Sequence, residues 1–423
     1  MAMFQLKCPL NFLKGSPMKL QRNISFSAQK KPSSDLFPQE VIINILLRLP
    51  VKSLHRFKSV SKKWRSIISD PYFVKTQMKY QEPKLVFQYC STIYSVDIGS
   101  PDHTVTKLQN PWKGNFADIL SCWNGLLFAK VRDYVNPDNY YLWNTMTGDY
   151  KTIPEHELDP SVSIKGFGYD FITDEYKVMI ADNFAAYIFS MKTNSWKEIK
   201  RHGISNGIYH ATSCTILHGI PHWMVEYYFT CSTSYYVQSR YDAVLYFGFA
   251  EEKFVKMPLP DEIENKKLWG LVVLGDNLCV IFHQIPRDSL AVWTMKEHGK
   301  KESWVKLFSV DHRLFQPDNN YPVDILCTTR DGDVVVTMNG TEIGICNVGL
   351  DKILQMKTGF AIKSVEFPSA RCRNKVVAYR EGLVSAFSSS SSTKDFRKKI
   401  MSRLFYVICG FVLLLVLLQR KYS

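Results

Sequence analysis

The chain has 423 residues, 46% of them hydrophobic and 13% aromatic, so it can bury a large core and divide into more than one folding unit. Its formal net charge is +14, of which residues 1–34 (six Lys/Arg, no acid) and 386–423 (seven Lys/Arg against Asp395) supply +12. Residues 35–73, with seven basic and three acidic groups, add +4, which leaves −2 for residues 74–385. A near-neutral body argues against a nucleic-acid groove, and we expect no nucleic-acid partner.

The ten cysteines are scattered singly, and no two form a CxxC pair. They stand at positions 8, 90, 122, 214, 231, 279, 327, 346, 372 and 409. This pattern predicts neither a zinc site nor a redox motif, and no cofactor is indicated. Reduced, packed thiols are typical of a protein of the cytoplasm or nucleus, which is where we expect this chain to be found.

Residues 1–34 are basic, free of acid and contain five serines. We expect a disordered extension, because such a segment cannot bury enough apolar surface to fold. An organelle transit peptide has the same composition and remains the alternative.

Helical spacing begins after Asp35. Pro38 suits a first helical turn, and the apolar residues Ile42, Ile45, Leu46 and Leu49 fall at i, i+3, i+4 and i+7, which predicts one amphipathic helix. Leu49 precedes Pro50, and a residue before proline is pushed out of the helical region, so the helix should end there.

Two further short helices are predicted before residue 75. Ser53 is a candidate N-cap for a helix carrying Leu54 and Phe57. Ser61 is a candidate N-cap for another carrying Trp64, Ile67 and Ile68, and Asp70-Pro71 should stop it. Residues 35–75 therefore read as a three-helix module.

Past residue 84 the chain has short runs rich in Val, Ile, Tyr, Phe and Trp, separated by Gly, Asn, Asp and Pro turns, which is an all-β pattern. A loose unit of two apolar strands joined by a polar turn recurs, with copies about 45–60 residues apart. The copies are 141–154, 187–199, 245–258, 291–307 and 343–354. This period favours the blades of a β-propeller, and a pair of packed β-sheets is the alternative.

The C-terminal end differs from the body. Ser388–Ser392 form a serine run, so residues 386–403 read as a basic, flexible linker. Residues 404–418 are an apolar segment of about 22 Å as a helix, short against the roughly 30 Å of a bilayer core. Basic residues flank it on both sides, so a tail anchor on an intracellular membrane facing the cytosol is one interpretation and a buried helix the other.

Residues 35–75 resemble an F-box. The residues that carry the resemblance are Leu36-Phe37-Pro38-Gln39-Glu40-Val41-Ile42, Ile45-Leu46-Leu47-Arg48-Leu49-Pro50-Val51-Lys52-Ser53-Leu54 and Phe57-Lys58-Ser59-Val60-Ser61-Lys62-Lys63-Trp64. The segment departs from the usual pattern at Phe37, where leucine is commoner, and at Asn44, where an acid is frequent.

Residues 84–385 resemble the F-box-associated, kelch-like domain of a large plant F-box family. The matching pieces are Ser121-Cys122-Trp123-Asn124-Gly125-Leu126-Leu127, Gly166-Phe167-Gly168-Tyr169-Asp170, Tyr176-Lys177-Val178, Gly219-Ile220-Pro221-His222-Trp223, and Val292-Trp293-Thr294-Met295 with Ser303-Trp304. Trp123 is one residue more than the family usually has. The resemblance ends near Ser385, so it does not extend to the 404–418 segment.

The two resemblances imply the substrate-recognition subunit of a Skp–cullin–F-box ubiquitin ligase. The F-box would bind a Skp-type adaptor and, through it, the cullin and the RING subunit, while the β domain would bind a protein substrate that the sequence does not identify. We predict an adaptor-binding surface formed by apolar residues, some of which should face inward. They are Pro38, Ile42, Leu46, Leu49, Leu54, Phe57, Val60 and Trp64.

The module is also basic, through Arg48, Lys52, Arg56, Lys58, Lys62, Lys63 and Arg65. A solvated rim or an acidic adaptor surface explains these charges better than a DNA-binding helix.

No catalytic or metal motif stands out elsewhere. His218 and His222 flank Pro221, which prevents the helix that would align an i, i+4 metal pair, so strand-and-turn histidines are expected. The sequence also lacks a GxSxG elbow and a phosphate-binding loop. We therefore expect an α+β chain without enzymatic activity. A propeller enzyme and a membrane-tethered scaffold without a ligase role are the rival hypotheses.

Overall fold

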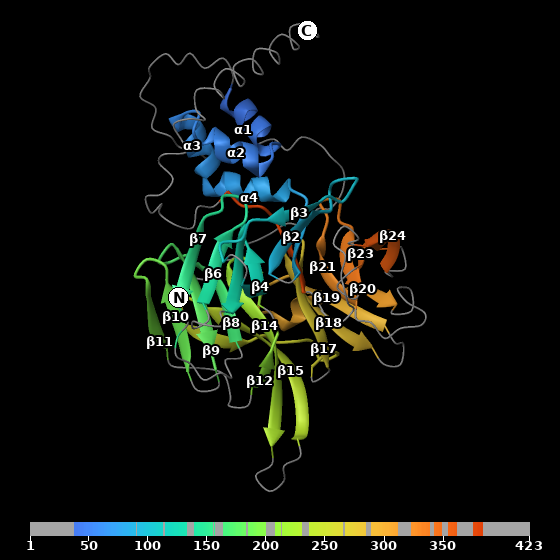
Figure 1. The fold of residues 1–423 in the computed structure, drawn as a ribbon. Helices are drawn as coiled ribbons and strands as arrows, with labels where there is room; N and C mark the ends of the chain where they lie inside the picture. The colour runs from blue at the N-terminus through green and yellow to red at the C-terminus, as the bar shows by residue number, and fades with distance from the viewer. Residues whose placement is uncertain are drawn as a thin grey trace. The chain divides into compact units, whose positions relative to one another are not determined.

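The computed structural model describes residues 38–89, 91–112, 115–132, 139–154, 156, 164–182, 185–199, 208–212, 214–230, 237–264, 267–284, 289–311, 323–338, 342–348, 354–361 and 375–383. A group of short helices comes first, and every later element except one short 3₁₀ helix is a β-strand (Figure 1). The predicted α+β class, with a helical module followed by a mainly β domain, is confirmed.

The described residues form four α-helices, one more than predicted. They are α1 (Gln39–Leu47), α2 (Val51–Phe57), α3 (Lys62–Ser69) and α4 (Pro71–Lys79). Asp70-Pro71 ends α3 as expected, but the same two residues also begin α4. The Asp70 carboxylate accepts hydrogen bonds from the backbone N–H of Tyr72 (2.9 Å) and Phe73 (3.1 Å), and Pro71 occupies the first helical turn, where a missing N–H costs nothing.

One of the two predicted caps is confirmed. The Ser61 hydroxyl accepts a hydrogen bond from the Trp64 backbone N–H at 3.0 Å. The prediction for Ser53 was wrong, because α2 begins two residues earlier, at Val51, and Pro50 is its N-cap. The earlier start places Val51 and Leu54 three residues apart on the buried side of the helix.

The β domain is a six-bladed propeller whose sheets contain four or five antiparallel strands. The first two blades in chain order contain β4 (Phe116–Trp123), β5 (Leu126–Arg132), β6 (Asn139–Asn144) and β7 (Tyr150–Pro154), then β8 (Ile164–Asp170), β9 (Glu175–Ala181), β10 (Ala186–Ser190) and β11 (Ser195–Ile199). The next two contain β12 (Ile208–Ala211), β13 (Thr215–Leu217), β14 (Ile220–Thr230), β15 (Val237–Gly248) and β16 (Lys253–Lys256), then β17 (Leu268–Leu274), β18 (Asn277–Gln284), β19 (Ser289–Met295) and β20 (Trp304–Asp311), with η1 (Lys301–Ser303) before β20. The last two contain β21 (Val323–Thr328), β22 (Val334–Met338), β23 (Glu342–Val348) and β24 (Leu354–Ala361), then β25 (Val376–Tyr379), β1 (Lys84–Tyr89), β2 (Thr92–Asp97) and β3 (Val105–Leu108).

The five repeated units predicted from the sequence correspond to the last two strands of five of these blades. For example, Tyr141 pairs with Thr152 between β6 and β7, and Tyr187 pairs with Glu198 between β10 and β11. The propeller interpretation is thus confirmed and the pair of packed sheets is excluded.

The sixth blade joins the two ends of the domain. β25 pairs with β1 from Lys84↔Tyr379 to Phe87↔Val376, although nearly the whole domain separates these strands in sequence. Two glycines meet beside this blade: a Cβ added to Gly125 would lie 2.3 Å from the Gly382 Cα. Asn144 Nδ2 donates to the Gly382 carbonyl at 3.3 Å. The C-terminal strand therefore closes the ring of blades.

The core lies between neighbouring blades. Trp143 and Trp223 are essentially buried, and one continuous cluster packs Phe128, Phe167 and Phe247 from three successive sheets. The five cysteines that the structure describes, Cys122, Cys214, Cys279, Cys327 and Cys346, form no disulfide, as the sequence predicted.

Within the described ranges, no helix has both the length and the apolar character needed to cross a membrane. The 1–34 extension, the 386–403 linker and the 404–418 segment lie outside the described residues.

Candidate functional site

The eight residues predicted to bind an adaptor divide into three groups by exposure. Leu46 and Leu54 are buried in the helical module. Ile42, Leu49, Phe57 and Trp64 are half-buried, and Pro38 and Val60 are exposed. Six of the eight therefore present surface that a partner can cover, and two stabilise the helices from within.

Two exposed apolar residues on α1 were not among those predicted to bind the adaptor. Val41 is 41% exposed and Ile45 is 51% exposed, and they stand four residues apart, one above the other on the helix. The signal was present in the sequence as an i, i+4 apolar pair. Ile45 was placed in the apolar stripe of Ile42 and Leu49, but neither Val41 nor Ile45 was among the eight residues predicted to bind the adaptor. Large aliphatic side chains exposed side by side are typical of a protein-binding surface.

Trp64 is held in place by local contacts. Its backbone N–H bonds the Ser61 cap, and its ring packs edge-on against Phe57 with centroids 5.2 Å apart. An edge-to-face aromatic pair fixes both rings and keeps their outer faces available. This arrangement gives the surface a pre-organised aromatic element, which reduces the entropy lost on binding.

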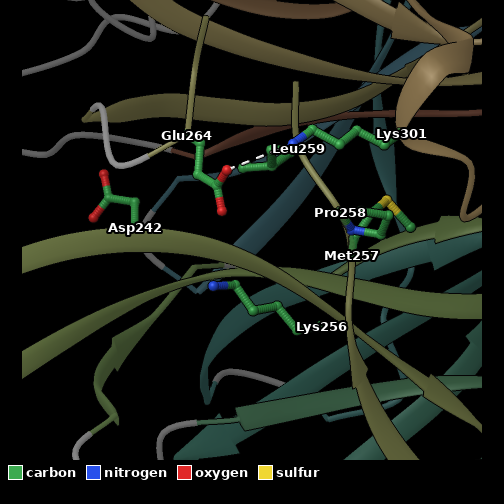
Figure 2. Close-up of a pocket in the computed structure, with 7 residues that line it drawn as sticks. All are labelled: Asp242, Lys256, Met257, Pro258, Leu259, Glu264 and Lys301. Atoms are coloured by element: carbon green, nitrogen blue, oxygen red, sulfur yellow. Dashed lines mark ion pairs between the residues drawn. The ribbon is translucent and has the colours of Figure 1, made fainter. Parts of the chain in front are cut away.

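A cavity of about 260 Å³ is present in the propeller (Figure 2). It is lined by Asp242, Lys256, Met257, Pro258, Leu259, Glu264 and Lys301. Two carboxylates face two ammonium groups there, and Lys301 pairs with Asp261 at 2.6 Å and with Glu264 at 3.8 Å. Asp242 accepts the Leu268 backbone N–H at 2.7 Å. The lining thus combines ionic groups with the apolar side chains of Met257, Pro258 and Leu259.

His218 and His222 lie where the sequence placed them, in a turn and in a strand. His218 is in the β13–β14 turn with φ of 50°, and His222 is fully buried in β14. The ring of His222 faces His298, not His218, with 2.9 Å between the two Nε2 atoms. Within the described residues, no group of three or more His, Cys, Asp or Glu side chains is arranged to hold a metal ion.

Trp123, which the sequence analysis noted as additional, belongs to an aromatic group at the β8–β9 turn. Its ring lies 6.5 Å from Tyr169 and 6.0 Å from Tyr176, and Phe171 packs on Tyr169 at 5.0 Å. Phe171 and Ile172, adjacent at the turn, are 69% and 76% exposed. This is an apolar surface on the propeller in addition to the one on α1.

Comparison with known proteins agrees with both parts of the structure. Residues 35–76 match the F-box domain, and residues 85–385 match the F-box associated beta propeller domain. A putative F-box protein of Arabidopsis thaliana is 28% identical over 320 residues, which cover 73% of this chain and 84% of that protein. F-box protein CPR1 of the same plant is 23% identical over 342 residues, covering 72% of this chain and 80% of the relative. The chain belongs to the family of F-box proteins that carry an F-box associated β-propeller domain.

Proposed function

We propose that this protein is the substrate-recognition subunit of a Skp–cullin–F-box ubiquitin ligase. In this proposal α1–α4 bind a Skp-type adaptor, the adaptor connects the chain to the cullin and the RING subunit, and the propeller binds the protein to be ubiquitinated. The observation that carries the proposal is the exposure of Val41 and Ile45 on the first helix of an F-box.

Exposing the apolar side chains of Val41 and Ile45 to water costs free energy, and an adaptor that covers them would recover it. Fully burying a large aliphatic side chain contributes about 1.5–3 kcal/mol, and Val41 and Ile45 are each about half exposed, so covering both can supply about 1.5–3 kcal/mol of binding energy. Ile42, Leu49 and Trp64 are half-buried and add further surface for a partner. A helical module of this size has few other ways to bury these side chains.

We further propose that the chain is not itself an enzyme. The transfer of ubiquitin would take place on other subunits, and the chain would contribute two binding surfaces held in one molecule. The match of residues 35–76 to an F-box and of residues 85–385 to an F-box associated propeller supports this view. We propose the cytoplasm or the nucleus as its location, since the cysteines described are free thiols.

The deciding experiment measures binding of a purified Skp-type adaptor to the intact protein and to a Val41→Asp, Ile45→Asp variant. Both positions are already exposed, so the helices should keep their fold while the adaptor surface gains two charges. We expect binding to weaken by at least about 100-fold, which corresponds to about 3 kcal/mol.

A matched control is Tyr150→Asp with Val348→Asp, two apolar residues of the propeller that are 50% and 40% exposed. This variant should bind the adaptor as the unmodified protein does. A second test variant, Leu49→Asp with Trp64→Ala, should also lose binding. If the well-folded unmodified protein does not bind the adaptor, the ligase role is wrong and a scaffold without a ligase role, tethered through residues 404–418, becomes the better hypothesis.

A further inference from the structure

The helical module carries a large positive charge that its own residues do not neutralise. Residues 39–80 contain nine Lys/Arg and two acids, Glu40 and Asp70. The Asp70 carboxylate is already used as the N-cap of α4. By contrast, residues 81–385 have a net charge of −4, so the positive field is a property of the helices and not of the propeller.

Six of these cations are exposed and, within the described residues, form no ion pair: Arg48, Lys52, Arg56, Lys62, Arg65 and Lys75. We call Arg48, Lys52, Arg56 and Lys62 the cationic surface. Lys52 and Arg56 stand four residues apart on α2, opposite the buried side of that helix, which carries Val51 and Leu54. Like charges at this spacing destabilise a helix by a few tenths of a kcal/mol.

Two observations show how crowded the positive charge is. Lys62 begins α3, whose first turn contains no acid, so its charge lies at the positive end of the helix dipole. Arg65 Nε donates to the Lys58 carbonyl at 3.1 Å, and burial together with the Arg65 charge lowers the pKa of Lys58. The free module therefore bears an electrostatic cost that an acidic partner would relieve.

The cations also alternate with the exposed apolar residues along the chain. Arg48 stands three residues after Ile45, and its backbone N–H donates to the Ile45 carbonyl at 3.2 Å. Lys62 stands two residues after Val60. Apolar residues with charged residues at their margin form the usual anatomy of a protein interface. A surface built for nucleic acid does not require the apolar part.

We propose that the cationic surface docks on an acidic protein surface of the Skp-type adaptor, beside the apolar contact, and steers the two proteins together. This inference rests on the proposed function and adds to it the chemistry of the partner. Long-range attraction acts mainly on the association rate, while short-range apolar contact sets the dissociation rate.

The test measures association and dissociation rates of the intact protein with purified adaptor at salt concentrations from about 0.05 to 0.5 M, a range over which screening shortens from roughly 14 to 4 Å. The test variant is Lys52→Glu with Arg56→Glu. We expect its association rate to fall at least about tenfold at low salt, to approach that of the unmodified protein at high salt, and its dissociation rate to change by less than about threefold.

The matched control is Lys107→Glu with Lys253→Glu, two exposed lysines of the propeller that change the total charge by the same amount. It should leave the association rate within about twofold of the unmodified rate at every salt concentration. Lys52→Gln with Arg56→Gln should give an intermediate effect, and circular dichroism should show the same helix content for all variants.

The outcomes separate the two proposals. If the unmodified protein binds the adaptor and the Lys52, Arg56 variant associates equally fast, the electrostatic inference is wrong and the proposed function stands. If the unmodified protein does not bind the adaptor at all, both fail. Tight binding of a short DNA duplex or of phosphatidylserine vesicles that depends on Lys52 and Arg56, with no effect of these residues on the adaptor, would also overturn the inference.

Discussion

His222 and His298 share one proton between facing ring nitrogens. Their Nε2 atoms are 2.9 Å apart, and His222 Nδ1 lies 2.9 Å from the Ile220 carbonyl. Because a carbonyl can only accept, Nδ1 of His222 carries the proton and its Nε2 accepts from His298. Both ring nitrogens of His222 are thus engaged while the ring is neutral, and a proton added to Nε2 would face the His298 donor.

This pair should make the propeller sensitive to mild acid. Burial, then the proximity of His298, lowers the pKa of His222 from 6.5 to about 3, and burial also lowers the pKa of His298. Between pH 6.5 and 3 the unfolded chain therefore binds more protons than the folded protein. The contribution of His222 to the free energy of unfolding is fully present above pH 6.5 and is lost as the pH drops toward 3. We expect the free energy of unfolding from urea titrations to fall by up to about 1.4 kcal/mol per pH unit for His222 alone.

The variant that checks this mechanism is His222→Gln, whose amide can accept from His298 and has no titration in this range. It should be less stable at pH 7.5 but show a flatter pH dependence between 4.5 and 6.5. Thr337→Val, which removes a buried hydrogen bond without touching a titratable side chain, is the control and should keep the unmodified pH dependence. Equal slopes for His222→Gln and the unmodified protein would contradict the assignment.

A second prediction concerns the buried ion pair of Asp170 and Lys177. The Lys177 ammonium lies 2.7 Å from Asp170 Oδ2, and the carboxylate also accepts the Ile172 backbone N–H at 2.9 Å. Burial alone would raise the pKa of Asp170, but these hydrogen bonds outweigh it and lower the pKa to about 2. Lys177→Met should destabilise the propeller by about 3–5 kcal/mol, because it leaves a buried carboxylate without its cation.

The exposed pair of Arg132 and Asp118, 2.8 Å apart, provides the control for that experiment. Asp118→Asn should cost less than about 1 kcal/mol, since solvent screens an exposed pair. The contribution of Asp170 is present above pH 3.8 and is lost as the pH falls through 3.8 toward 2, so the stability difference between the unmodified protein and the Lys177→Met variant should shrink over this range. A cost for Lys177→Met no larger than that for Asp118→Asn would show that the pair is not stabilising.

The contact between Gly125 and Gly382 gives a third prediction. Gly125 has φ of 78°, and a Cβ there would lie 2.3 Å from both the Cα and the N of Gly382. Gly148 has nearly the same φ, 77°, but nothing within 4 Å of an added Cβ. Gly148→Ala should therefore cost only the backbone strain, about 1–2 kcal/mol, while Gly125→Ala should cost at least about 2 kcal/mol more through overpacking.

Urea denaturation of the two glycine variants measures the difference directly, because the backbone term is common to both. If the two costs are equal, the close approach of the chain at Gly382 is not maintained in solution.

A fourth prediction concerns the closing strand. A chain that ends at Ser385 keeps β25, whereas one that ends at Asn374 lacks it and exposes the edge of β1 that β25 covers. We expect the longer chain to melt in one cooperative transition and the shorter chain to be poorly soluble or to lose cooperativity, as followed by circular dichroism. A cooperative transition of the shorter chain at the same temperature would mean that the ring does not depend on β25.

The sequence by itself determined the local elements of this protein. The Ser61 cap and the repeated strand pairs depend on residues near one another in the chain, and both were found where they were predicted. The helix before Pro50 also formed, but it ends at Leu47 and not at the predicted Leu49. Helix capping and strand alternation are short-range effects, so a pattern in the sequence is enough to reveal them. The F-box and propeller resemblances added the order of the domains.

Only the tertiary structure decided which of these residues meet and which stay exposed. Whether a residue of the α1 stripe is buried, as Leu46 is, or exposed, as Ile45 is, depends on what packs against the helix. Helix α4 forms because the Asp70 side chain, which follows the end of α3, also caps the start of α4. The number of blades and the pairs His222–His298 and Gly125–Gly382 join residues far apart in sequence. Such contacts are selected by packing the whole chain at once, because the free energy of burial depends on complementary surfaces that no local pattern specifies.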